Sequence, residues 1–409
     1  MGTILLIFLF NLNLREMDAV ERVLKTINHE EPDRVPAFES IITSRTLMIH
    51  YGVIKAPKKP PTTKKSTPIK TKGTPFEIWK KIWENKNVIK AGAKNLYELY
   101  RRAGIEIVPS MATGFTRFTL ADGRTVNEYG KIFQRELYEK DGTPINGYVG
   151  GYIKSFEDYE SWEKPDPHWE ARLTNFKACR ELQEEMNNEI FSVPATGALM
   201  EVSWEGFGLE TFSRILRKHK QAKTVFDDRG KFALELVKIL AENDAKMVIL
   251  WDDYGFKNGL FMPPKNYRTY VFPWIKQICK AAHERNCKVL LHSDGDLLEI
   301  FDDIVKCGID VINPIESTTA NPNYNIFKLH EKYGDKITFA GNLSPIMLAM
   351  GDISEIEAYA KKLIRELAPN GGYIFGSGHS INPAVTVDRF EAMQNIRRKH
   401  GNYPINVPD

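Results

Sequence analysis

Short apolar runs recur along this chain, and segments with a helical pattern separate most of them. The runs are rich in β-branched residues, as buried parallel strands are. They cover residues 35–39, 104–109, 190–194, 246–251, 288–292, 310–313, 337–341 and 373–376. Between the later runs, apolar residues return at helical spacing. Ile356, Ala360, Leu363 and Leu367 are one example, and they form one face of a helix.

Eight strands that alternate with helices predict an α/β fold, a TIM-type (β/α)8 barrel. The competing architecture is an open doubly wound sheet, which often carries a glycine-rich phosphate loop after its first strand. Here the first run ends in Glu39-Ser40-Ile41-Ile42, which is not such a loop. We therefore expect a single barrel domain over residues 17–409.

The pattern changes between the second and third predicted strands. Residues 115–126 alternate apolar and polar side chains around Asp122-Gly123, which indicates a hairpin. Residues 132–138 and 148–153 look like further short strands. We expect residues 113–155 to form a small β-rich insertion above the barrel, where it would line one side of an active site.

Charge and composition exclude some classes of protein. Hydrophobic residues make up 42% of the 409 residues, which is typical of a globular chain with a sizeable core. The net charge of +3 is too small to indicate a nucleic-acid partner. Seven lysines and no acid lie between Lys55 and Pro75, a stretch rich in Pro and Thr that we expect to be a flexible loop.

The first 16 residues form an apolar extension that is hard to place. The apolar run Ile4–Phe10 is too short to span a bilayer, and it lacks the features of a signal peptide. A misassigned start before Met17 is our interpretation, and a weak membrane anchor is the alternative. The four cysteines form no CxxC pair or zinc-finger spacing, which favours a reduced, cytoplasmic protein.

Polar side chains gather where the predicted strands end, which is where barrel enzymes carry their active sites. They are Glu39, Glu106, Thr196, Asp252, Asp253, His292, Asp294, Glu316, Asn342 and His379. Such residues suit hydrogen bonding and proton transfer. A strand-end acid often caps the following helix instead, and Asp252 and Asp296 are open to that interpretation.

The most specific local feature is His292-Ser-Asp294. If the strand continues, these two side chains point to the same side, and a carboxylate beside a histidine makes it a general acid or base near neutral pH. The alternative is that His292, Asp294 and His379 bind zinc. His379 itself lies between small residues in Gly376-Ser-Gly-His379, which leaves its ring accessible.

Adjacent carboxylates mark the end of the fourth predicted strand. Neighbouring acids either separate their pKa values or point in opposite directions. We expect one of Asp252 and Asp253 to enter the site while the other caps or pairs.

Taken in order, these motifs resemble the uroporphyrinogen decarboxylase superfamily, which also contains cobamide-dependent methyltransferases. The chain opens with Glu21-Arg-Val-Leu and Asn28-His-Glu-Glu-Pro-Asp-Arg-Val-Pro36. Asp252-Asp-Tyr-Gly255, His292-Ser-Asp-Gly, Asn313-Pro-Ile-Glu316, Gly341-Asn342 and Gly376-Ser-Gly-His379 follow in the family's order. The resemblance extends from about Met17 to Pro404.

The resemblance implies a uroporphyrinogen decarboxylase-like lyase of porphyrin biosynthesis that removes carbon dioxide from a tetrapyrrole or related carboxylate without a cofactor. Asp253 or Asp294 would stabilise the electron-poor ring, and His292 or His379 would return a proton. The remaining candidates would bind substrate: Glu39, Arg45, Glu106, Asp252, Tyr254, Glu316 and Asn342. A homodimer would be common for such a barrel.

Two departures from the family pattern keep other functions open. The decarboxylases carry an arginine pair after the first strand for the substrate carboxylates, and only Arg45 is available here. The methyltransferases bind zinc through His-x-Cys and a later Cys, where this chain has Asp294 and His379. The alternatives are therefore methyl transfer with a corrinoid protein as partner, and a non-catalytic tetrapyrrole-binding protein.

Overall fold

The computed structural model describes residues 16–56 and 74–408, and its centre is a curled parallel sheet. The strands run in the order β1-β6-β7-β10-β11-β12-β13. Their bounds are β1 Ile107–Met111, β6 Phe191–Gly197, β7 Met247–Trp251, β10 Lys288–His292, β11 Val311–Asn313, β12 Thr338–Ala340 and β13 Tyr373–Ile374. Each pair of neighbours is parallel. Seven of the eight predicted runs are thus strands of one sheet.

The first predicted run joins the two edges of this sheet. Ala37 forms a parallel bridge to Phe375, beside β13, and Phe38 forms one to Ile107 in β1. Backbone N–H groups of Phe38 and Phe375 donate to Phe375 O and Pro36 O, respectively. Residues 35–39 therefore bring the chain's early and late segments together, although they are too short to count as a strand.

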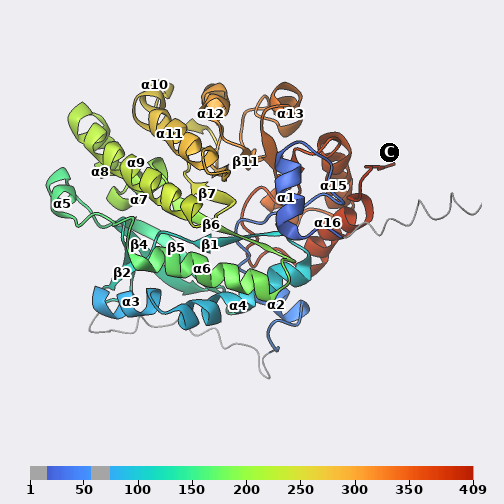
Figure 1. The fold of residues 1–409 in the computed structure, drawn as a ribbon, viewed down its shortest axis with the longest axis horizontal. Coiled ribbons are helices and arrows are strands. Elements are labelled where there is room, and N and C mark those ends of the chain that lie inside the picture. The colour runs from blue at the N-terminus through green and yellow to red at the C-terminus, as the bar shows by residue number, and fades with distance from the viewer. Residues whose placement is uncertain (1–15, 57–73, 409) are drawn as a thin grey trace, which may run out of the picture.

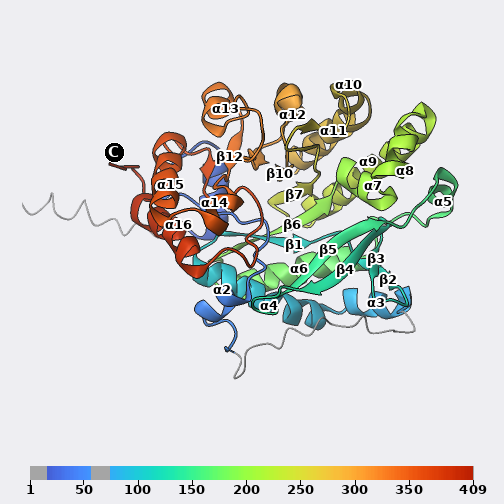
Figure 2. The ribbon, with the colours of Figure 1, turned by 180° about the vertical axis from the view of Figure 1, so that it is seen from behind.

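Helices lie outside the sheet, in agreement with the helical pattern between the runs (Figures 1 and 2). The amino-terminal ones are α1 Ala19–Ile27, α2 Arg45–His50, α3 Phe76–Trp83, α4 Lys86–Ala103, α5 Phe156–Ser161 and α6 Glu170–Glu185. The middle ones are α7 Met200–Phe207, α8 Leu209–Leu216, α9 His219–Glu242, α10 Pro264–Asn266, a π-helical turn Tyr267–Val271 and α11 Phe272–His283. A 3-10 turn Leu298–Ile300, α12 Phe301–Cys307, α13 Ile326–Tyr333, α14 Pro345–Met350, α15 Ile353–Leu367 and α16 Val387–His400 complete the set.

The inside of the curled sheet is apolar. Side chains from successive strands form one buried cluster, which includes Val193, Ile249, Leu290 and Val311. Ala19, Val23 and Ile27 of α1 belong to the same cluster, so α1 covers the end at which the strands begin. The other end, where the strands finish, is left for polar residues.

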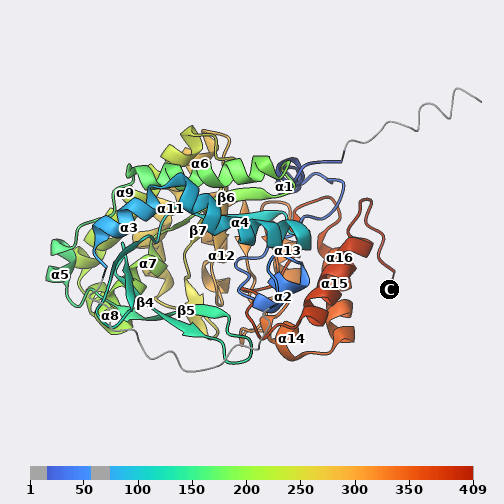
Figure 3. The same cartoon turned by 90° about the horizontal axis from the view of Figure 1, so that it is seen from below.

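A second, antiparallel sheet lies between β1 and β6 in the sequence. Its strands are β2 Thr116–Thr119, β3 Thr125–Asn127, β4 Lys131–Leu137 and β5 Pro144–Gly151, paired in that order. Figure 3 shows the long β4–β5 hairpin reaching toward α2. At its turn, the Thr143 hydroxyl accepts a hydrogen bond of 3.2 Å from the Arg45 backbone N–H.

Two sequence features fall outside the described residues. The apolar run Ile4–Phe10 is one, and most of the Lys-rich stretch 55–75 is the other. Within residues 16–56 and 74–408, no helix combines the length and apolar character that crossing a membrane requires. The four cysteines are buried free thiols.

Candidate active site

Three predicted residues meet where β7 and β10 end. Asp253 follows β7, His292 is the last residue of β10, and Asp294 lies two residues beyond it. One ligand atom from each lies within 4.8 Å of the others. The strand pairing explains this proximity, because His292 stands opposite Trp251 in the β7–β10 register. The strand ends at His292, as the predicted run did, so a loop presents Asp294 and the condition of a continuing strand is not met.

Hydrogen bonds orient the ring of His292. Its Nδ1 lies 2.7 Å from Asn313 Oδ1, and Asn313 Nδ2 donates to the backbone oxygen of Ala340 at 3.1 Å. Since the amide nitrogen is occupied by Ala340, the oxygen must face the histidine and Nδ1 must carry a proton. The neutral ring then has its lone pair on Nε2.

The Nε2 atom of this ring lies near an oxygen of Asp294. Nε2 of His292 lies 3.9 Å from Asp294 Oδ1. Among the described residues, this buried oxygen has no hydrogen-bond partner. A histidine whose second nitrogen is held by a carbonyl oxygen, next to two carboxylates, is the usual arrangement of a metal ligand. The residues present therefore fit a divalent metal ion with nitrogen and oxygen ligands.

His379 reaches the other oxygen of the same carboxylate. Its Nε2 lies 3.2 Å from Asp294 Oδ2, and about half of the His379 side chain is exposed. The hydrogen bond to Asp294 raises the pKa of His379, against the opposing effect of burial. Burial alone would raise the pKa of Asp294, but the His379 hydrogen bond and the two histidines lower it. His379 is thus held as a proton donor beside Asp294.

The Asp294→Asn variant is expected to bring the pKa of His379 back toward its ordinary value of 6.5. The contact with Asp294 that raises the pKa of His379 stabilises the fold below pH 6.5. This contribution is lost as pH rises through the raised pKa. The contacts that lower the pKa of Asp294 stabilise the fold above pH 3.8. This contribution is lost as pH falls through the lowered pKa. Titration of the metal-free protein by histidine NMR measures the shift.

The control for this titration is Asp296→Asn. Asp296 lies two residues on, but its oxygens accept from Leu298 and Asn321. The pKa of His379 should not change in this variant. An unchanged pKa in Asp294→Asn as well would show that the contact does not form in solution.

Asp253 completes the group from a half-buried position. Its Oδ1 accepts a hydrogen bond of 2.9 Å from the Asp294 backbone N–H. Burial, together with the negative charges of Glu201 and Asp294, raises its pKa well above the ordinary value. Nearby acids and burial therefore both disfavour the charged form of this carboxyl.

Three further charged residues join this end of the sheet, and the sequence analysis did not identify them. Lys131 of β4 extends from the antiparallel sheet to α7, where its Nζ lies 3.1 Å from Glu201 Oε1 and also contacts Glu205. Glu201 and Glu205 are four residues apart and so share one face of α7. A pair of acids at helical spacing within an otherwise apolar segment was the available signal.

Lys131 is the shared counterion of Glu201 and Glu205, and these three residues form a charged trio. Burial opposes ionisation of Glu201, but the charge of Lys131 outweighs it and lowers the pKa of Glu201. For Glu205, burial and the charge of Glu201 raise the pKa to about 8. The Glu201 charge also acts on Asp253, so the trio and the histidine–carboxylate group form one electrostatic unit.

Asp252 points away from its neighbour and caps a helix. Its Oδ1 accepts from the backbone N–H groups of Leu199 and Glu201, at 2.9 and 3.0 Å. These groups belong to the unpaired first turn of α7. Asp252 is fully buried, which raises its pKa to about 7. It orients the helix that carries Glu201 and Glu205.

The other strand-end candidates lie around this group in supporting positions. Tyr254 is fully buried and packs against Tyr267 and Phe272. Glu316 Oε2 accepts from the Gly295 backbone N–H at 2.9 Å. Asn342 is buried, and its amide bonds the Ile315 carbonyl and the Tyr359 hydroxyl. Thr196 is buried as well, with its hydroxyl on Gly197 O.

Glu39 and Arg45 come from the chain that follows the first predicted strand. Glu39 is fully buried against Ser377, in the loop that carries His379. Arg45 starts α2 and is partly buried, and its Nε has no hydrogen-bond partner in the described part of the chain. No ion pair between Arg45 and the site acids is present among the described residues.

Glu106 requires a correction. We expected it just before the end of a strand that covered residues 104–109, but β1 begins at Ile107 and Glu106 precedes it. It therefore lies at the amino-terminal end of the parallel sheet, whereas His292 lies at the carboxyl-terminal end. Its carboxylate lies 3.4–3.6 Å from the guanidinium nitrogens of Arg22, Arg34 and Arg397. The physical reason for the error is that a short apolar run does not define where its strand begins.

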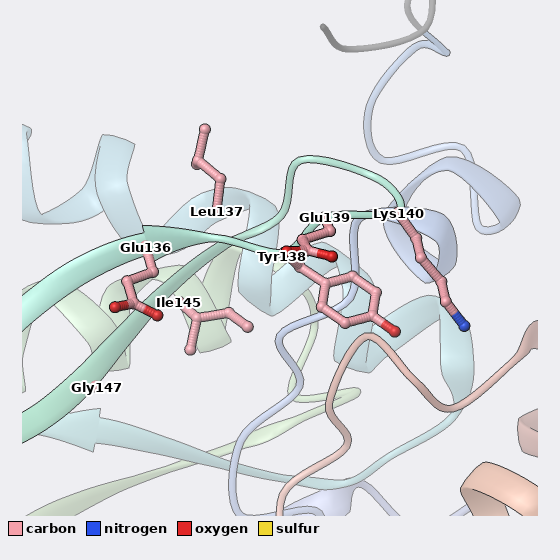
Figure 4. Close-up of a pocket in the computed structure, with 7 residues that line it drawn as sticks. All are labelled: Glu136, Leu137, Tyr138, Glu139, Lys140, Ile145 and Gly147. Atoms are coloured by element: carbon pink, nitrogen blue, oxygen red, sulfur yellow. The ribbon is translucent and has the colours of Figure 1, made fainter. Parts of the chain in front are cut away.

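A separate pocket of about 380 Å³ lies at the tip of the β4–β5 hairpin. Figure 4 shows the side chains of Tyr138 and Lys140 on one side of the turn and Leu137 pointing away from them. Its lining is Glu136, Leu137, Tyr138, Glu139, Lys140, Ile145 and Gly147. None of these residues belongs to the group around Asp294.

Known proteins resemble this chain in sequence and in fold. It is 24% identical over 257 residues to the uroporphyrinogen decarboxylase of Thioalkalivibrio sulfidiphilus, which covers 58% of this chain and 67% of that protein. It is 24% identical over 242 residues to the uroporphyrinogen decarboxylase of Geobacter sulfurreducens, covering 57% and 67%.

A solved structure of a methyltransferase from Methanosarcina mazei covers 94% of this chain and 99% of its own, with a TM-score of 0.64 at 18% identity, so it shares the fold. The family model of uroporphyrinogen decarboxylase (URO-D) matches residues 137–400. That match takes in β6 to β13, with Asp253, His292, Asp294 and His379. The chain therefore belongs to the uroporphyrinogen decarboxylase superfamily.

Proposed function

We propose that this protein is a metal-dependent enzyme of the superfamily that transfers a methyl group, with a corrinoid protein as its partner. The observation that carries the proposal is the His292–Asp294 contact. Nε2 of His292 and an unpaired, buried carboxylate oxygen of Asp294 lie 3.9 Å apart, with Asp253 beside them. A positive charge between these two atoms stabilises the arrangement, and a divalent ion supplies it while also bonding Asp253.

The charges around the group also favour a metal over a polycarboxylate substrate. Four carboxyl groups gather here, Glu201, Glu205, Asp253 and Asp294, and burial raises the pKa of two of them. The lysine nearby is already shared by Glu201 and Glu205. Among the described residues, no arginine forms an ion pair with these acids, so the group offers no guanidinium of the kind that binds substrate carboxylates.

Each residue has a part in the proposed reaction. Asp253, His292 and Asp294 would hold the ion, which as a Lewis acid would polarise a heteroatom of the methyl donor or acceptor. Asn313 keeps the His292 lone pair directed at the site. His379, protonated beside Asp294, would deliver a proton to the heteroatom from which the methyl group departs.

Metal content tests the proposal. The full chain would be stripped with a chelator and titrated calorimetrically with Zn²⁺, Mn²⁺ and Co²⁺, and the untreated protein would be examined by elemental mass spectrometry. One ion per chain is the expected result. A chain that contains no stoichiometric metal and binds none of the three ions would overturn the proposal.

Cofactor-independent decarboxylation remains the second candidate, and the His379–Asp294 pair favours it. A protonated histidine beside a carboxylate could return a proton to carbon after carbon dioxide leaves. This candidate predicts carbon dioxide release that a chelator does not abolish. Methyl transfer predicts instead that methylcobalamin turnover depends on the metal, and a tetrapyrrole carrier would bind porphyrin with no product formed.

A further inference from the structure

We propose that Glu39 is a neutral carboxylic acid which, through Ser377, positions the loop that carries His379 against Asp294. The inference concerns a loop that both candidate reactions use, so it does not depend on which of them is correct. Glu39 does not contact the reacting group itself. Its role is that of a positioning residue.

Two hydrogen-bond contacts connect Glu39 to this loop, and a third lies within the loop. The Ser377 backbone N–H donates to Glu39 Oε1 at 3.1 Å. The Ser377 hydroxyl contacts Glu39 Oε2, and the same hydroxyl contacts the backbone oxygen of His379. The hydroxyl therefore stands between an oxygen of Glu39 and an oxygen of the residue whose ring faces Asp294.

The protons available to these contacts determine the protonation state of Glu39. A backbone carbonyl can only accept, and so can an ionised carboxylate, whereas a serine hydroxyl has a single proton to donate. If Glu39 were ionised, one of the two contacts of Ser377 would bring two oxygens together without a proton. A proton on Glu39 Oε2 satisfies both contacts: Glu39 donates to Ser377, and Ser377 donates to His379.

The surroundings of Glu39 also favour its neutral, protonated form. Its side chain is fully buried, and burial raises its pKa to about 8. Arg397 is the positive charge that acts on Glu39, but its guanidinium lies 3.6 Å from Glu106 and bonds the carbonyls of Val35 and Gly104. Tyr100 donates to the Glu39 backbone oxygen, not to its carboxyl group.

The backbone around Ser377 leaves little room for other arrangements. A Cβ at Gly376 would lie 2.0 Å from the Phe38 carbonyl oxygen, so the two segments are in direct contact. Ile381 N–H donates to Ile41 O at 2.8 Å, and the hydroxyls of Ser40 and Ser380 lie 3.2 Å apart. Glu39 bonds the loop from inside this contact.

The test uses the full chain, stripped of metal, and a set of matched variants. Glutamine imitates a neutral Glu39, because its amide can donate to Ser377 Oγ and accept from the Ser377 N–H. Glu39→Gln should therefore leave the imidazole resonances of His379 unchanged. Glu39→Ala and Ser377→Ala should move them toward those of Asp294→Asn. At pH 6, infrared difference spectra of wild type against Glu39→Gln should show the loss of one carboxylic-acid carbonyl band.

Controls separate positioning from a loss of folding. Glu391→Gln changes a glutamate that bonds His50 and Tyr51 and should leave His379 untouched. The resonances of His283, which pairs with Asp310 elsewhere, report whether each variant is folded. The proposal is overturned if Glu39→Gln perturbs His379 as strongly as Glu39→Ala, if no carboxylic-acid band is lost, or if Ser377→Ala leaves His379 unchanged.

Discussion

Zinc affinity is expected to fall by more than about 100-fold in the His292→Ala variant, the largest effect on the site that we anticipate. Removing a residue that only hydrogen-bonds a metal ligand typically weakens metal binding about 10–100-fold. Removing the ligand itself should weaken metal binding more than that. Asn313→Ala, which frees Nδ1 of His292, should therefore fall within that smaller range. Calorimetric titration of the stripped proteins measures both variants.

The matched control is His283→Ala. His283 also pairs with an aspartate, at 2.7 Å from Asp310, but it lies outside the metal-capable group. Zinc affinity should not change in this variant. Equal affinities for wild type and His292→Ala would mean that His292 is not a ligand, whatever the metal content of the protein.

The largest expected effect on stability comes from Glu106→Ala, at the opposite end of the sheet. The carboxylate is buried among Arg22, Arg34 and Arg397, and it also accepts from the Ala37 backbone N–H at 2.8 Å. Removing one partner of a buried ion pair typically costs about 3–5 kcal/mol, because the remaining charge loses its counterion. Here that charge is Arg397, since Arg22 and Arg34 keep ion pairs with Asp33 and Glu16. Urea denaturation of the full chain measures the change in free energy of unfolding.

Glu210→Ala provides the comparison for that measurement. Glu210 pairs with Arg214 on the surface of α8, and its side chain is 80% exposed. An exposed pair of this kind contributes about 0.3–0.5 kcal/mol. If Glu106→Ala were no more destabilised than Glu210→Ala, the buried charge of Arg397 would not depend on Glu106 for its stabilisation.

The pattern of strand ends predicted the central part of the candidate site. Parallel strands of one sheet finish at the same end, so polar residues after β7 and β10 had to lie close together, as Asp253, His292 and Asp294 do. The pair Asp252-Asp253 left open which acid would face inward. Only the backbone N–H groups of α7, which Asp252 caps, decide the question.

Other parts of the site were beyond the sequence pattern for physical reasons. Lys131 lies on an antiparallel strand far from α7 in sequence, and nothing in its own neighbourhood indicates the two glutamates that it contacts. Glu106 was misplaced because a run of six residues fits several strand registers equally well. The hydrophobic pattern determines which face is buried, but it does not determine which residue begins the strand.

The junction between residues 37–39 and residues 375–377 has a consequence for how the protein is made. Ala37 pairs with Phe375 and Glu39 bonds Ser377, contacts that join positions 338 residues apart. Contacts between such distant positions form late, since the intervening chain must be ordered first. During synthesis on the ribosome, β7 and β10 emerge well before Ser377 and His379. Asp253, His292 and Asp294 therefore leave the ribosome before the segment that closes the junction and carries His379.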